Sequence, residues 1–128
     1  MRRYVIDASV LVEAIGGGDV ASLASRGSQF FEPSVLPYEV ANVLRKLRSK
    51  SPHGRQKQND AFSLLMRFPA VYWPWDAVAW RVWELRHNLT STDASYVAVA
   101  EMTGSTLVTR DRRLAAAPGI RCAVEVLP

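Results

Sequence analysis

The chain is poor in cysteine and histidine. Cys122 is the only cysteine among 128 residues, so no disulfide can form within the chain and a small scaffold held by disulfides is excluded. This composition agrees with a reducing compartment. The two histidines, His53 and His87, have no second histidine at ligand spacing, and we assign them no role in metal binding.

The sequence also has no long hydrophobic run. No stretch approaches the ~20 apolar residues of a membrane-spanning helix. The N-terminal segment superficially imitates a signal peptide, but Asp7, Glu13 and the glycines from Gly16 interrupt it. We therefore expect a cytoplasmic protein that does not enter a membrane. A length of 128 residues fits one domain that folds without disulfides or a structural metal.

Acidic residues are outnumbered. There are 16 Lys and Arg against 12 Asp and Glu, a formal net charge of +4. If several acids gather in one cleft, the surface around that cleft is more basic still. A basic body around an acidic cleft suits a polyanion such as RNA, held through metal ions. The alternative is a basic surface without a specific partner, and charge alone does not separate the two.

Strand-like and helix-like segments alternate along the chain. The expected strands are Arg3–Ile6, Gln29–Glu32, Ala70–Trp73, Thr106–Thr109 and Arg121–Val126. The expected helices are Ala8–Ile15, Asp19–Ser25, Ser34–Arg48, Gln56–Arg67, Asp76–His87, one from Thr92 or Asp93 to Met102, and a short turn at Arg110–Ala116. This alternation predicts one α/β domain over residues 1–128 with a mainly parallel sheet. The third and fourth helices would form an antiparallel pair.

Four carboxylates stand where strands end or helices begin. Asp7 ends the first strand and Asp111 follows the strand Thr106–Thr109, whereas Glu39 and Asp93 lie early in helices. Strand ends and helix starts share one edge of a parallel sheet, where ligands bind in open α/β folds. We therefore expect all four side chains to face one cleft.

Helix geometry turns two of these acids inward. Glu39 shares a face with Leu36 and Val43, and Asp93 shares one with Val97. A charged side chain that faces inward needs a partner of opposite charge. No Lys or Arg stands at a position that would pair it with these acids. A cation is the natural partner, and oxygen ligands favour Mg²⁺ or Mn²⁺. Taken alone, each acid could cap a helix or stabilise the dipole of a helix at its N-terminus. The four together are harder to explain in that way.

Four short motifs carry a resemblance to a known family. They are VIDAS (5–9), YEVANVL (38–44), TDASYVAVAE (92–101) and LVTRD (107–111). In this order they resemble the PIN-domain ribonucleases, and the small size resembles the VapC-type toxins of type II toxin–antitoxin pairs. The resemblance covers nearly the whole chain. The region Ser49–Trp75 matches only as a helical clip.

The resemblance implies a three-layer α/β/α sandwich and a Mg²⁺-dependent endoribonuclease that leaves a 5′-phosphate and a 3′-hydroxyl. By this resemblance, the acidic quartet of catalytic and metal-binding residues is Asp7, Glu39, Asp93 and Asp111. Ser9 and Thr109 match hydroxyl positions that support it. The family often has a further acid after the Asp111 position. Here Arg112 and Arg113 follow instead, so one bound ion or two stays open.

The resemblance further implies an RNA substrate, a VapB-type antitoxin and a homodimer. Basic residues that could bind the RNA backbone, against the alternative of a solvated basic face, are Arg110, Arg112, Arg113, Arg45 and Lys46. We expect core packing for most of the four tryptophans, Trp73, Trp75, Trp80 and Trp83. An exposed subset would offer a dimer face or a groove for an antitoxin segment. We expect a structural role for Glu101.

Three other functions are alternatives for this sequence. One is a PIN nuclease of RNA maturation without an antitoxin, and another is a PIN module that binds RNA without cleaving it. A phospho-receiver domain would require an aspartate at the end of the central strand and a lysine after a late strand. The expected central strand instead runs into Trp73-Pro74-Trp75, and no lysine occurs near the last strand.

Overall fold

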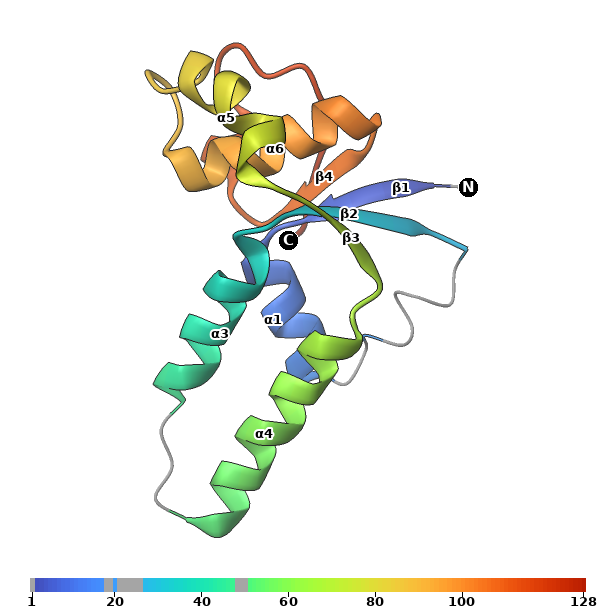
Figure 1. Cartoon of the computed structure of the whole chain (residues 1–128), viewed down its shortest axis with the longest axis vertical. Helices are drawn as coiled ribbons and strands as arrows, with labels where there is room; N and C mark the ends of the chain where they lie inside the picture. The colour runs from blue at the N-terminus through green and yellow to red at the C-terminus, as the bar shows by residue number, and fades with distance from the viewer. Residues whose placement is uncertain (1, 18–19, 21–26, 48–50) are drawn as a thin grey trace.

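The computed structural model describes residues 2–17, 20, 27–47 and 51–128 (Figure 1). The strands are β1 (Arg3–Ile6), β2 (Gln29–Pro33), β3 (Ala70–Trp73), β4 (Thr106–Thr109) and β5 (Val124–Val126). The helices are α1 (Ala8–Gly16), α3 (Leu36–Lys46), α4 (Pro52–Arg67), α5 (Trp75–Glu84), α6 (Ser91–Thr103) and α7 (Arg112–Ala115). The helix expected at Asp19–Ser25 lies, except for Val20, outside the described residues.

The five strands form one sheet in the order β3-β2-β1-β4-β5. Every neighbouring pair is parallel, so the sheet is wholly parallel where a mainly parallel one was expected. The chain moves from central β1 to β2 and β3 on one side, then crosses to β4 and β5 on the other. This reversal places a topological switch point between β1 and β4. The order differs from the 2-1-3-4-5 order of receiver-type folds, which removes that alternative.

Helices cover the sheet in two further layers (Figure 1). Helices α5 and α6 lie above it in that view, and α1, α3 and α4 lie below, where α3 and α4 form the expected antiparallel pair. Helix α6 packs between the sheet and α5, so every residue from Ala94 to Ala100 is buried. The α/β class and the three-layer arrangement are therefore confirmed. No helix in the described part of the chain is both long and apolar enough to cross a membrane.

Three helices begin earlier than the sequence predicts, and one of them is α6, which starts at Ser91. The hydroxyl of Ser51 accepts the N–H of Gly54 at 3.0 Å and caps α4, which therefore starts a full turn before Gln56. Helix α5 starts at Trp75, so Asp76 lies in its first turn and is not its N-cap. Residues before the predicted starts of these helices, a proline among them, thus belong to the helices themselves.

The expectation that most tryptophans pack in the core is wrong. Helix α5 turns two valines toward α6, which leaves its opposite side to solvent. The side chains of Trp75, Trp80 and Trp83 are 58%, 81% and 59% exposed. We call these three residues the tryptophan face. Sequence spacing alone did not show which side of α5 the rest of the fold covers.

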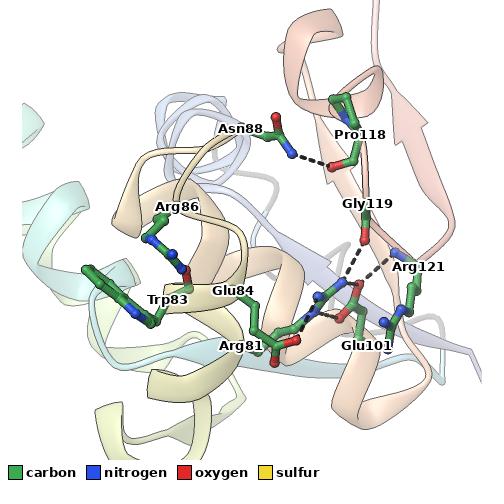
Figure 2. Close-up of polar contacts among 9 residues, drawn as sticks. All are labelled: Arg81, Trp83, Glu84, Arg86, Asn88, Glu101, Pro118, Gly119 and Arg121. Atoms are coloured by element: carbon green, nitrogen blue, oxygen red, sulfur yellow. Dashed lines mark hydrogen bonds and ion pairs between the residues drawn. The ribbon is translucent and has the colours of Figure 1, made fainter.

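Glu101 has the structural role that we expected (Figure 2). Its carboxylate binds the guanidinium of Arg81 through two contacts, at 2.7 and 3.1 Å, and accepts the backbone N–H of Arg121 at 2.7 Å. Arg81 also donates to the carbonyl of Gly119 at 2.7 Å. These bonds tie the segment after α7 to α5 and α6. Because Arg121 donates its N–H to Glu101, the last strand begins at Val124, later than predicted.

Candidate active site

Asp7 lies at the topological switch point of the sheet. It follows β1 directly, and its backbone N–H donates to the carbonyl of Val108 in β4 at 3.1 Å. One carboxylate oxygen, Oδ1, accepts the hydroxyl of Ser9 at 2.7 Å and the N–H of Val10 at 3.1 Å. The other, Oδ2, accepts the hydroxyl of Thr109. Asp7 is therefore the N-cap of α1 and is also held between two hydroxyls.

Asp111 is linked to Asp7 by the same threonine, because the Thr109 hydroxyl bonds to both residues. The fully buried Thr109 accepts the N–H of Asp111 at 3.1 Å through its hydroxyl oxygen. Asp111 in turn caps the short helix α7, because its Oδ1 accepts the N–H of Arg113 at 2.9 Å. Thr109, at the end of β4, thus fixes the chain between two of the predicted site acids.

Asp93 lies in the first turn of α6 and is not its cap. Thr90 caps the helix, since its hydroxyl accepts the Asp93 N–H at 3.2 Å. Burial raises the pKa of the Asp93 carboxyl, and the negative charges of Asp111 and Asp7 raise it further. Thr90 and Arg113 oppose this change in pKa. The mutual repulsion means that three carboxylates from β1, α6 and the β4–α7 junction share one region.

Glu39 completes the predicted quartet from the first turn of α3. Its Oε1 accepts the hydroxyl of Tyr96, which comes from α6, at 2.6 Å. Burial raises the pKa of the Tyr96 hydroxyl far above its ordinary value, and the bond to Glu39 with the nearby charges of Glu39, Glu32 and Asp7 raises it further. Tyr96 therefore stays a hydrogen-bond donor.

Glu32 is an acid beside the site that sequence reasoning missed. It lies near the end of β2 and is 0% exposed. Its Oε2 accepts the N–H of Ile6, the residue before Asp7, at 3.0 Å, and its Oε1 has no described partner. Burial raises the pKa of Glu32 well above its usual range; the Ile6 N–H opposes this and the Asp7 charge adds to it. The signal in the sequence that could have identified Glu32 is an acid inside an apolar strand.

A model of the PIN domain matches residues 4–120 of the chain. The chain belongs to the PIN-domain family. Ribonuclease VapC9 of Mycobacterium tuberculosis is 32% identical over 124 residues, which span 97% of this chain and 98% of that protein.

Solved PIN-like structures share the fold. The crystal structure of PAE2754 from Pyrobaculum aerophilum superposes on this PIN domain with a TM-score of 0.69, at 28% identity, over 98% of this chain and 84% of that one. VapBC2 from Rickettsia felis, crystallised with a DNA fragment from its promoter, gives a TM-score of 0.70 at 16% identity and covers 98% and 99% of the two chains. The latter identity supports the fold alone.

Asp7 and Asp111 lie near enough to Asp93 for their charges to affect its carboxyl group, but the described acids of this PIN domain are not arranged as a closed metal site. Among the described residues, no three His, Cys, Asp or Glu side chains are spaced to hold an ion directly. The donor set nevertheless fits Mg²⁺, which keeps several of its waters and needs only one or two carboxylates. The raised pKa of Asp93, caused by burial and then by two other carboxylates, marks the excess negative charge that a cation would offset.

The predicted RNA-binding arginines of the PIN domain differ in their surroundings. Arg110 is ion-paired with Glu13 of α1, with Nε and Oε2 2.5 Å apart, and also donates to the carbonyl of Pro128. Arg112 is exposed and lines an open groove beside Val126 and Pro128. Arg113 is 95% exposed, with Nε 3.6 Å from Oδ1 of Asp111. Arg113 thus places a positively charged side chain beside Asp111.

The two basic residues of α3 lie farther away. Arg45 and Lys46 are exposed in the last turn of the helix. With a rise of ~1.5 Å per residue, they are about 9 Å or more along the axis from Glu39. A backbone phosphate near them would therefore belong to a nucleotide distant from the acids.

Proposed function

We propose that this protein is a metal-dependent endoribonuclease that hydrolyses RNA phosphodiester bonds and acts as the toxin of a toxin–antitoxin pair. The observation that supports the proposal most is the link that Thr109 makes at the switch point: its hydroxyl donates to Oδ2 of Asp7 and accepts the N–H of Asp111. Asp93 is near enough for the charges of both acids to add to the effect of burial in raising its pKa. The similarity to ribonuclease VapC9 extends over nearly the full length of both chains, which favours ribonuclease chemistry.

We assign the cation to the quartet Asp7, Glu39, Asp93 and Asp111, with Mg²⁺ or Mn²⁺ as the ion. The chemistry that such an ion supplies is activation of water as the nucleophile and neutralisation of charge on the phosphate. Ser9 and Thr109 hold the Asp7 carboxylate in one orientation through their hydroxyls. A carboxylate of the quartet orients the attacking water in line with the scissile bond. Arg113 reaches a substrate phosphate beside Asp111.

The proposed partners follow from the same reading. RNA would bind as an exposed single strand or loop, because bases there are accessible. A VapB-type antitoxin would restrain the enzyme in the cytoplasm. We propose that residues 1–128 act as one PIN domain. We further propose that two copies associate through the tryptophan face, since these three tryptophans of one helix are each more than half exposed and tryptophan is enriched at protein interfaces. A small open reading frame upstream of the gene would distinguish a toxin from a nuclease of RNA maturation.

The test compares RNA cleavage by the wild type, Asp7→Asn and Asp93→Asn, with and without Mg²⁺. Each variant keeps the side-chain shape and removes one charge. We expect cleavage to require Mg²⁺ and to fall by about a hundredfold or more in both variants, because several kcal/mol of charge stabilisation are lost. Asp76→Asn, an exposed acid of α5, is the matched control and should cleave normally. Equal cleavage in all conditions would sink the proposal.

The toxin role has its own measurement. Induced expression of the wild type should stop bacterial growth, and Asp93→Asn should not. Co-expression with the neighbouring antitoxin should restore growth. Unchanged growth on expression of an active nuclease would argue for the maturation alternative.

A further inference from the structure

The bond between Tyr96 and Glu39 joins two helices from different layers of the fold. Helix α6 lies on one side of the sheet and α3 on the other (Figure 1). The Tyr96 hydroxyl donates to Oε1 of Glu39 at 2.6 Å across the 57 residues that separate them. Tyr96 lies three residues after Asp93, on the same face of α6. One face of α6 therefore carries a site acid and a hydroxyl that reaches a second site acid.

The bond occupies one oxygen of Glu39 and leaves the other available. Within the described part of the chain, Oε1 accepts from Tyr96 and Oε2 accepts no hydrogen bond. An unanchored glutamate has many rotamers, and holding it in one costs conformational entropy. Carboxylates that bind metal ions are themselves usually hydrogen-bonded, and removal of such a partner typically weakens metal binding by 10–100-fold. The geometry thus presents Oε2 with its orientation already set.

The position of Tyr96 suits this role. Tyr96 is 2% exposed, so the donor side of its bond to Glu39 is shielded from water, whereas Glu39 is only partly buried. Tyr38, the residue before Glu39, is 74% exposed and no hydrogen bond of its hydroxyl is found among the described residues. The two tyrosines thus differ in burial and in contact with the site, although both have the same phenol group.

We propose that Tyr96 is a positioning residue that holds Glu39 ready to bind the divalent cation. This inference rests on the proposed function, because it requires a cation at the acidic quartet. Tyr96 itself touches neither the cation nor the RNA. Its contribution is the orientation of the Glu39 carboxylate.

The first experiment measures Mn²⁺ binding by the full chain without RNA, by electron paramagnetic resonance or calorimetry. Tyr96→Phe removes only the hydroxyl, and we expect its Kd for Mn²⁺ to rise about tenfold. Tyr38→Phe makes the same chemical change on the exposed side and should bind as the wild type does. In RNA cleavage, Tyr96→Phe should need more Mg²⁺ for half-maximal rate, and excess Mg²⁺ should restore the maximal rate. A loss through misfolding would not be restored in this way.

A double-mutant cycle separates positioning from packing. In a Glu39→Ala background, Tyr96→Phe should cause no further loss of Mn²⁺ affinity, because no carboxylate is left to orient. A further loss of the same size would overturn the inference. So would equal Mn²⁺ affinity in Tyr96→Phe and the wild type, while the proposed function would stand. If the wild type binds no Mn²⁺, the proposed metal dependence and this inference both fail.

Discussion

Replacing Glu32 by glutamine should make the stability of the protein less dependent on pH. The carboxyl is 0% exposed, and burial raises its pKa well above the usual range. The folded protein therefore retains this proton after the unfolded chain, with an ordinary pKa of about 4.3, has lost it. The free energy of unfolding is highest below that pH, falls as pH rises toward the folded pKa, and levels off above it. Glutamine has no proton to lose.

The size of the effect follows from linkage. One proton held only by the folded state changes the free energy of unfolding by about 1.4 kcal/mol per pH unit. The advantage of Glu32→Gln over the wild type should grow at that rate above about pH 4.3. Glutamine also keeps an oxygen for the N–H of Ile6, which Glu32 now accepts at 3.0 Å. Glu32→Leu removes this acceptor and should be about 1–3 kcal/mol less stable than Glu32→Gln.

The assay is urea unfolding followed by circular dichroism from about pH 4 to about pH 8, with linear extrapolation to water. Glu125→Gln, an exposed acid on β5, is the control for a general change of charge. Its profile should run parallel to that of the wild type. If Glu32→Gln also runs parallel, Glu32 ionises in the fold much as it does in the unfolded chain, and the reasoning from burial is refuted.

Three further predictions concern other parts of the fold. Trp80→Ser should convert a dimer to a monomer in light scattering, because it removes an aromatic side chain that is 81% exposed, whereas Met66→Ser on α4 should not. Glu101→Gln should lower the free energy of unfolding, measured in urea, by about 2 kcal/mol. Burial raises the pKa of Glu101, but Arg81 and Arg121 outweigh burial and lower it. The stabilisation by the Glu101 carboxylate should therefore be present above about pH 4.3 and disappear as pH falls through the folded pKa. Gly104→Ala should lower the free energy of unfolding by about 1–2 kcal/mol, because φ is 65° and an L-residue is strained there. No atom lies within 4 Å of an added Cβ, so the cost comes from the backbone and not from a clash. An unchanged melting temperature would contradict this.

Local sequence determined where most elements lie. Arg3–Ile6, Ala70–Trp73 and Thr106–Thr109 form strands with the predicted bounds, because short apolar runs between turn and capping residues have few other structures open to them. The same pattern placed Asp7 and Asp111 at strand ends. The alternation of strands and helices was sufficient for the parallel sheet, since parallel neighbours require crossover connections.

Only the tertiary structure decided which side chains meet and which remain in water. Thr109 reaches Asp7 across 102 residues and Tyr96 reaches Glu39 across 57; neither contact follows from spacing along one helix or strand. Burial of Glu32 and exposure of Trp80 likewise depend on what packs against β2 and α5. Periodicity shows that an element has two faces. Segments far away in the chain decide which face is buried. They also decide which charged groups and hydroxyls contact that face.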